Sequence, residues 1–181
     1  MSRWTHTHEA LRRAALELFS EQGYDATGTA QVAARAGVSE MTLFRHFSSK
    51  DALLLEDPFD PLMADAVRAR PADEAPMRAV AEGVREVWRE VHEGSLESLR
   101  SRLRIVAESA TLHGAVERNS AATVSALAEA LTGRGVGAAQ ARVAAAAVVA
   151  GLSTALLAWA RDEGAVLEDM LGRALDVLGG R

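Results

Sequence analysis

A short stretch near the amino terminus combines side chains that suit hydrogen bonding to a polyanion. Glu40, Thr42, Arg45, His46 and Lys50 fall within eleven residues, and Lys50 is the single lysine beside 19 arginines. Arginine can pair with guanine O6 and N7, and a carboxylate can accept from cytosine N4. Lysine, threonine and histidine side chains suit phosphate oxygens. The stretch therefore predicts contact with both the base edges and the backbone of a nucleic acid.

Signals for catalysis are weak by comparison. The sequence contains no His-Glu-x-x-His, no Gly-x-Ser-x-Gly and no P-loop motif. The glycine-rich residues 133–137 follow a predicted helix and not a strand, which favours a helix–helix loop over a phosphate cradle. Without cysteine there is no disulfide framework and no thiolate metal site. We therefore expect no enzyme, no metal site and no cofactor.

A helix with one apolar face is expected before this stretch. Apolar side chains recur at i, i+4, i+7 and i+8 from Leu11 to Phe19, which is one face of a helix. Thr7 is a candidate N-cap and Gly23 a candidate C-terminal residue. These features predict a helix over residues 8–22.

The next two helices are expected to cross steeply. The pattern predicts a helix over residues 29–36 that ends at Gly37, and Ser39 is placed to cap the next helix. Val38 can pack on Leu43 as a hydrophobic staple. Because a new helix begins only three residues after the last one ends, the arrangement is typical of a helix-turn-helix.

The remainder predicts a second, larger helical part. A short helix with Ser48 as its cap runs to about residue 56, and all four prolines lie between residues 58 and 76. Aromatic content is only 4% and alanine is abundant. We expect an all-α protein. Its predicted parts are an N-terminal three-helix helix-turn-helix domain over 1–50, a connecting helix and proline-rich joint over 51–75, and a helical effector-binding and dimerisation domain over 76–181.

The charge is distributed unevenly between these parts. The whole chain carries −5, yet residues 1–50 hold six basic and five acidic side chains, and residues 51–181 hold 14 and 20. Nucleic acid is therefore expected to meet the first fifty residues. Residues 143–160 are uncharged but mostly alanine, so we expect a helix packed in the protein and no membrane span. The amino terminus lacks the apolar core of a signal peptide, so a cytoplasmic location is expected.

Residues 23–54 resemble the tetracycline-repressor (TetR) family of bacterial transcriptional regulators. The resemblance is carried by Gly23-Tyr24, by residues 33–39 (AARAGVS), by residues 42–47 (TLFRHF), and by Ser49-Lys50 with Leu53. It implies a homodimer that binds double-stranded operator DNA and is released by a small molecule held in the C-terminal domain.

The resemblance also implies roles for individual residues. Lys50 corresponds to a lysine that contacts the DNA backbone, and Thr27, Thr42, Phe44 and His46 are implied as further backbone contacts. Arg45 is our candidate base reader. The expected DNA-binding set is Thr27, Glu40, Met41, Thr42, Phe44, Arg45, His46 and Lys50.

Several positions depart from the family pattern. Gly28-Thr29 replaces a Thr/Ser-then-aliphatic pair, Met41 replaces a commonly small residue, and Phe44 lacks the usual tyrosine hydroxyl. These departures concern the operator sequence and not the fold. Arg3 and Trp4 fit either an N-terminal arm for the minor groove or a disordered tail.

The C-terminal part offers candidates for two further surfaces. Trp88, His92, His113 and Trp159 are predicted to line an effector pocket, the alternative being core and exposed positions. Small and apolar residues predict a dimer interface through the last two helices, the alternative being packing within one chain. The predicted interface residues are Ala144, Ala147, Gly151, Leu152, Ala155, Leu156, Leu167, Leu171 and Leu175.

The sequence thus predicts a ligand-responsive DNA-binding regulator, with repression favoured over activation. The alternatives are a helical small-molecule binding protein or an enzyme that no longer reads DNA. The effector, the operator and the regulated genes are not specified by the sequence.

Overall fold

The computed structural model describes residues 2–56, 59–90 and 93–180. Within these ranges the chain forms α-helices and one 3₁₀ turn, and no strand. The all-α prediction is therefore confirmed. The chain divides into two compact units, Met1–Glu56 with Ser101–Val116, and Asp57–Arg100 with Glu117–Arg181.

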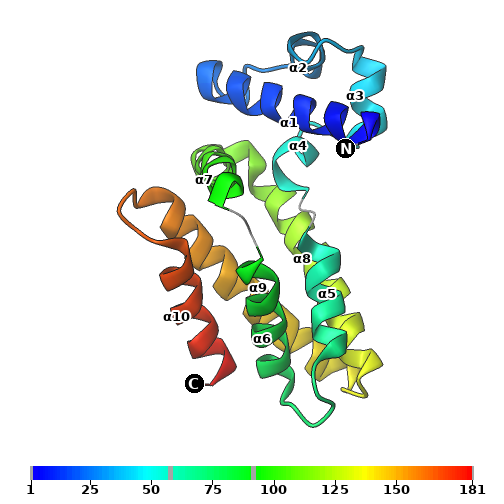
Figure 1. The fold of residues 1–181 in the computed structure, drawn as a ribbon, viewed down its shortest axis with the longest axis vertical. Coiled ribbons are helices and arrows are strands. Elements are labelled where there is room, and N and C mark those ends of the chain that lie inside the picture. Colours follow the sequence, from blue (N-terminus) through cyan, green and yellow to red (C-terminus); the bar gives the residue numbers. More distant parts are fainter. Residues whose placement is uncertain (1, 57–58, 91–92, 181) are drawn as a thin grey trace. The chain divides into compact units, whose positions relative to one another are not determined.

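The first unit begins with four helices, α1 (Arg3–Gln22), α2 (Thr29–Arg35), α3 (Glu40–His46) and α4 (Ala52–Leu55), labelled in Figure 1. Helix α1 starts five residues before the predicted bound because Ser2 caps it, its Oγ accepting from the Thr5 N–H at 3.1 Å. The predicted cap, Thr7, lies inside the helix and donates to the Arg3 carbonyl. Arg3 and Trp4 are therefore helical, and neither a separate arm nor a tail.

The turn between α2 and α3 follows the predicted chemistry. Gly37 has φ +73°, a conformation that L side chains rarely adopt. The Ser39 Oγ accepts from the Thr42 N–H at 3.1 Å, as an N-cap does. For α4 the predicted cap was wrong, because Ser49, and not Ser48, accepts from the Ala52 N–H.

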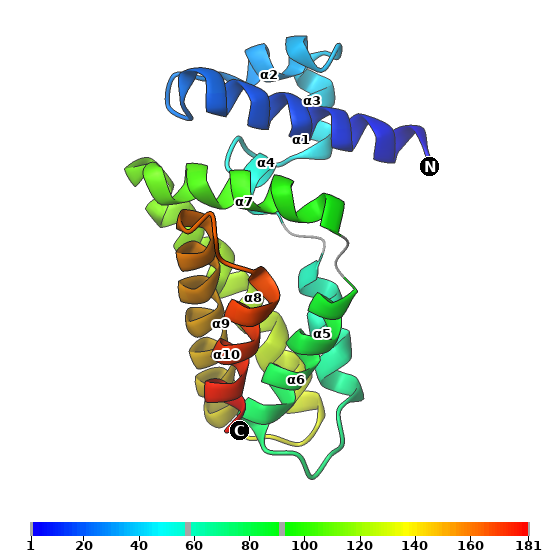
Figure 2. The same cartoon turned by 60° about the vertical axis from the view of Figure 1, so that its left-hand side comes forward.

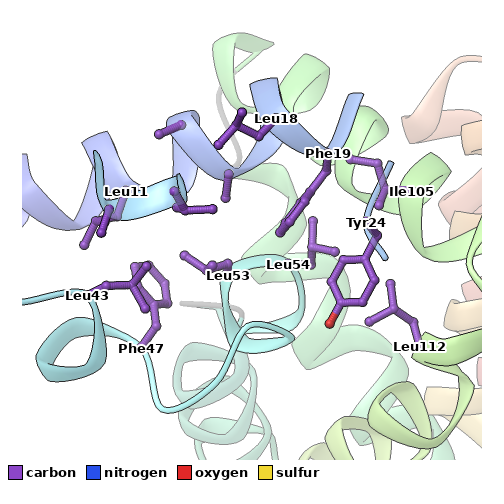
Figure 3. Close-up of a cluster of buried hydrophobic side chains, with 14 of the residues drawn as sticks. Leu11, Leu18, Phe19, Tyr24, Leu43, Phe47, Leu53, Leu54, Ile105 and Leu112 are labelled. Carbon is purple, nitrogen blue, oxygen red and sulfur yellow. The ribbon is translucent and has the colours of Figure 1, made fainter. Parts of the chain in front are cut away.

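A buried apolar cluster holds the first unit together. Figure 3 shows Leu11, Leu18 and Phe19 of α1 facing Leu53 and Leu54 of α4, with Tyr24 beside them. The cluster also takes in side chains from residues 101–116: Ile105, Leu112 and Ala115.

Two polar contacts add to the attachment of residues 101–116. The Thr111 hydroxyl donates to Asp25 Oδ1 at 2.6 Å, and Arg102 Nη1 donates to the Leu54 carbonyl. The compact unit is consequently larger than residues 1–50, since those residues cover their core with a segment that is distant in sequence.

The second unit contains α5 (Phe59–Ala69), α6 (Pro76–Arg89), α9 (Ala138–Arg161) and α10 (Leu167–Gly179). Helix α7 (Glu93–Glu108) and helix α8 (His113–Gly133) each contribute residues to both units, and the 3₁₀ turn Ala110–Leu112 joins them. Helix α10 packs against α6 and α9, and α5 packs against α6, as Figure 2 shows. Gly83 permits the close approach of α5, because a Cβ there would lie 2.8 Å from Val67 Cγ2 and 3.0 Å from its backbone nitrogen.

Helix α9 is the one described helix that is long and apolar enough to cross a membrane, with a mean hydropathy of 2.0 over its best window. The protein buries 44% of that window. Helix α9 packs against α6 and α10, and its buried side chains include Leu152 and Trp159. The core helix of a protein can have this character.

Candidate nucleic-acid interface

Helix α3 has one face in the core and one face open to solvent. Leu43 and the following Phe47 are buried, whereas Met41 is 67% and Phe44 is 50% exposed. Glu40 and Arg45 are exposed on the same helix, and Thr42 and His46 are partly exposed. Such a helix, anchored by apolar side chains and presenting charged, polar and aromatic groups, fits a major groove.

Two contacts hold side chains on the open face of α3. Glu40 Oε1 accepts from the Thr29 hydroxyl at 2.5 Å, which links the beginnings of α2 and α3. Arg45 Nη2 lies 3.6 Å from Met41 Sδ, one helical turn earlier. Thr29, one of the departures from the family pattern, therefore positions a predicted base-contacting residue.

Lys50 occupies the loop before α4 and not its first turn. Its Nζ donates to the carbonyls of Tyr24 at 2.9 Å and Thr27 at 3.0 Å, and lies 4.0 Å from the centre of the Tyr24 ring. Since an ammonium group has three N–H bonds, one donor is left for a phosphate oxygen. Lys50 thus connects the α1–α2 loop to α4 as well as offering charge.

The hydroxyl groups of Thr27 and Tyr24, next to Lys50, already make hydrogen bonds within the protein. Thr27 is buried, and its hydroxyl donates to the Gly23 carbonyl at 2.8 Å and accepts from Gln22 Nε2 at 3.1 Å. The Tyr24 hydroxyl donates to Asp51 Oδ1 at 3.0 Å, and burial together with this carboxylate raises the pKa of Tyr24. The Thr27 hydroxyl is therefore engaged within the unit, and the partly exposed Thr42 hydroxyl lies 2.9 Å from the Ser39 hydroxyl.

An aromatic stack that the sequence pattern did not predict lies beside α3. Trp4 stacks on His8 and on His46, and His8 stacks on Phe47 with ring centroids 4.1 Å apart. Burial and the nearby Arg12 and His46 lower the pKa of His8. The i, i+4 spacing of Trp4 and His8 was a usable signal, but only for a helix that starts before Thr7.

This stack borders a concavity of about 400 Å³ on the first unit. It brings together residues from the start of α1 and from α3: Arg3, Trp4, Thr7, Val38, Ser39, Thr42 and His46. Two predicted DNA-contacting residues therefore share a surface with Arg3, which adds a cation to it.

The predicted pocket residues that the structure describes belong to different parts of the chain. Trp159 is buried in the second unit, where its Nε1 donates to the Ala165 carbonyl at 3.1 Å and Arg100 lies over its ring. His113 belongs to the first unit, and its Nδ1 lies 2.6 Å from the Ala110 carbonyl. His92 lies outside the described residues. Trp88 lines a cavity that is formed mainly by α6 and α10.

Most of the predicted dimer residues pack within one chain. Ala144, Leu152, Ala155, Leu167, Leu171 and Leu175 are buried in the isolated protomer, and Ala147, Gly151 and Leu156 are partly buried. A Cβ at Gly151 would lie 2.7 Å from Leu178 Cδ1, so this glycine serves the approach of α9 and α10. The six buried residues take part in intramolecular packing, which small and apolar residues at helical spacing serve as well as an interface.

Each of the same two helices also exposes an apolar side chain. Val143 is 69% and Val177 is 81% exposed. Ala146, Ala150 and Thr154 are also exposed on α9, at intervals of four residues.

In the described part of the chain no group of three or more His, Asp and Glu side chains is arranged to hold a metal.

Two family models match the chain. Residues 11–56 match the model for bacterial regulatory proteins of the tetR family, and residues 74–181 match the model for the MftR C-terminal domain.

Two curated proteins match shorter segments. The chain is 38% identical over 101 residues to the HTH-type transcriptional regulator TcmR of Streptomyces glaucescens, covering 55% of this chain and 45% of that protein. It is 52% identical over 42 residues to the HTH-type transcriptional activator FasR of Mycolicibacterium smegmatis, covering 23% and 19%. The matches thus span less than half the length of these relatives.

Solved structures share the fold over nearly the whole chain. A TetR-family regulator from Streptomyces coelicolor has a TM-score of 0.60 at 22% identity and covers 99% of this chain and 96% of that one. SmeT, the repressor of the Stenotrophomonas maltophilia multidrug efflux pump SmeDEF, has a TM-score of 0.59 at 22% identity and covers 94% and 87%.

Proposed function

Because the chain belongs to the TetR family of bacterial regulatory proteins, we propose that it is a repressor that binds a palindromic operator as a homodimer and leaves it when a small molecule binds. The observation that carries the proposal is the open face of α3, held by Leu43 and Phe47 in the core of a helix-turn-helix. Occupying a promoter blocks transcription without a further contact surface, so repression is favoured over activation. The protein acts in the cytoplasm, where the operator is.

The residues of the first unit divide into base readers and backbone contacts. Arg45 reads a guanine, and Glu40, positioned by Thr29, accepts from a cytosine amino group. Met41 and Phe44 contact thymine methyl groups or sugar edges. The backbone contacts come from Thr42, His46 and the remaining N–H of Lys50. Thr27 contributes through the loop that Lys50 holds, since its own hydroxyl is engaged.

A dimer places two copies of α3 in successive major grooves, about 34 to 36 Å apart. The exposed apolar positions on α9 and α10, including Val143 and Val177, are the proposed contact between protomers. A two-fold axis through this face gives each protomer the same surface to bury. Residues 51–75 connect this part of the chain to the DNA-reading helices.

Release requires an effector that binds one conformation of the dimer more tightly than the other. We place the effector in the second unit, where Trp88 lines a cavity. Binding there changes the separation of the two α3 helices, and the operator then fits less well.

The test is a gel-shift titration with DNA from upstream of the gene that encodes the chain. A regulator gives a specific shift whose affinity falls with salt by a slope of about −0.9 per phosphate neutralised. A scrambled fragment of equal length and composition is the control. If no promoter fragment shifts specifically at low salt, the protein is instead a small-molecule binding protein or an enzyme.

A further inference from the structure

A cavity of about 360 Å³ lies within the second unit, lined mainly by α6 and α10, with Leu96 of α7 also at its wall. Its volume falls in the range of small-molecule sites. Much of its wall is apolar: Trp88, Leu96, Leu167, Leu171 and Leu175. Such a wall suits a flexible or flat apolar body.

Two guanidinium groups stand at the same cavity. Arg85 and Arg89 are one turn apart on α6 and both line it, whereas Glu168 is the single carboxylate among the lining residues. In the described part of the chain Arg89 makes no ion pair. Beside the apolar wall, the lining residues therefore include two guanidinium groups and one carboxylate, and the charge of Arg85 is shared with Asp176 and Glu82 outside the lining.

Arg85 is held in place by its own partners. Its Nη2 donates to Asp176 Oδ1 at 2.7 Å, and its Nε lies 3.7 Å from Glu82 Oε2. Only 14% of its side chain is exposed. A guanidinium fixed in this way offers its remaining edge to a ligand without losing rotamer freedom on binding.

Gly172 leaves that remaining edge uncovered. It lies inside α10, where glycine costs about 1 kcal/mol relative to alanine, and a Cβ there would lie 3.9 Å from Arg85 Nη1. Because Gly172 and Arg85 both line the cavity, no side chain of α10 at position 172 stands between the cavity and the Arg85 guanidinium.

We propose that this cavity binds an amphipathic molecule, with its apolar body against Trp88 and the leucines of α10 and an anionic head group at Arg85 and Arg89. The proposal rests on the proposed function in one respect, since this molecule is the effector that release requires. The binding site itself stands on the geometry of the second unit alone.

The test is isothermal titration calorimetry of the full chain without DNA. The probes share a ten-carbon chain and differ in head group: decanoate, 1-decanol and the decyltrimethylammonium cation, all below their micelle concentrations. Decanoate is expected to bind about tenfold more tightly than decanol, and the cation more weakly than either. Equal affinities for all three, or no decanoate binding, would overturn the proposal.

Two variants locate the site. Arg89→Gln is expected to weaken decanoate binding about tenfold and to leave decanol unchanged. Arg173→Gln, which removes an exposed arginine of α10 that does not line the cavity, is the matched control. Gly172→Leu fills the cavity with a good helix former and is expected to abolish binding of both probes with no loss of thermal stability. If Gly172→Leu binds decanoate normally, the site lies elsewhere.

The calorimetry tests the binding site and the gel shift tests the regulator, so either proposal can be overturned without the other. Decanoate that binds at Arg89 but leaves the operator complex intact would remove the link to release and retain the site. An operator complex that forms and dissociates with another molecule, in Arg89→Gln as in the unaltered protein, would retain the regulator and overturn the anionic effector.

Discussion

The indole of Trp4 stacks on the imidazole of His46, with ring centroids 4.9 Å apart and planes inclined by 28°. The contact joins the first turn of α1 to the last turn of α3. Trp4 also stacks on His8, whose ring lies 5.8 Å from that of His46 and stacks on the buried Phe47. The position of His46 at the end of the proposed recognition helix is therefore set partly by α1.

Replacing Trp4 tests this support. Trp4→Ala is expected to weaken operator binding about two- to tenfold, because an aromatic pair contributes about 0.5–1.5 kcal/mol beyond its buried area. Trp4→Phe keeps a stacking ring and should bind nearly as the unaltered protein does. Fluorescence anisotropy with a labelled operator measures both. An alanine variant with full affinity would show that the stack does not position α3.

His8 gives the first unit a pH dependence. The folded protein holds the pKa of His8 below its ordinary value of 6.5, chiefly through burial, with Arg12 and His46 contributing and Glu9 opposing. A lowered pKa means that the unfolded chain binds the proton more readily. The stabilising contribution is therefore complete above pH 6.5 and is lost as the pH falls below it, through the folded pKa.

Urea unfolding between pH 8 and pH 5 measures this effect. His8→Gln should show a smaller loss of stability on acidification than the unaltered protein. His6→Gln, on the exposed side of the same helix, is the matched control and should leave the pH dependence unchanged. Equal slopes for His8→Gln and the unaltered protein would assign the acid sensitivity to other groups.

Lys50 is expected to contribute to both stability and DNA binding. Lys50→Ala removes the donor to the Tyr24 and Thr27 carbonyls, and hydrogen bonds from a charged group contribute about 1.5–3 kcal/mol. It should also weaken binding to all DNA sequences alike and reduce the salt slope by about one. Thermal unfolding and salt titrations separate the two effects. A change in base preference would contradict a backbone role.

Arg45 is expected to act through sequence preference instead. Arg45→Ala should relax the preference at one base position by about 1–3 kcal/mol, because a bidentate contact with guanine is lost. Arg13→Ala removes the same charge from an exposed position of α1 and is the control for general electrostatic loss. Competition binding across operators changed at each position measures the preference. A uniform loss for Arg45→Ala at all positions would exclude base reading.

Local signals explain which elements could be predicted from the sequence. The turn at Gly37 and the cap at Ser39 depend on residues within a few positions of each other, so the helix-turn-helix followed from the pattern. The start of α1 did not, because its cap, Ser2, precedes the apolar repeat that reveals the helix. The stack of Trp4 on His46 was missed for the same reason.

Contacts between distant segments explain the rest. Nothing near Thr111 in the sequence indicates that it bonds to Asp25, or that Ile105 completes the core of the first unit. The apolar pattern of α9 and α10 identified two helices with much area to bury. On α9 it could not distinguish the face that the neighbouring helices cover from the exposed face, since both are rich in small and apolar residues.

The exposed face gives the last prediction. Val177→Glu is expected to convert the dimer to monomers, because a two-fold interface brings equivalent surfaces together and the two new carboxylates repel within it. Val177 is 81% exposed in the protomer, so its replacement should change the free energy of unfolding by no more than about 0.5 kcal/mol. Operator affinity should fall steeply, since each monomer reaches only one half-site.

Sedimentation velocity measures the oligomeric state, and Leu62→Glu is the matched control. Leu62 is an exposed apolar residue of α5, outside α9 and α10, so the same substitution there should leave the dimer and its operator affinity intact. Val143→Glu on α9 should act as Val177→Glu does. If both α9 and α10 variants sediment as dimers while Leu62→Glu dissociates, the protomers meet through a different face, and the spacing of the two α3 helices must be derived from that face instead.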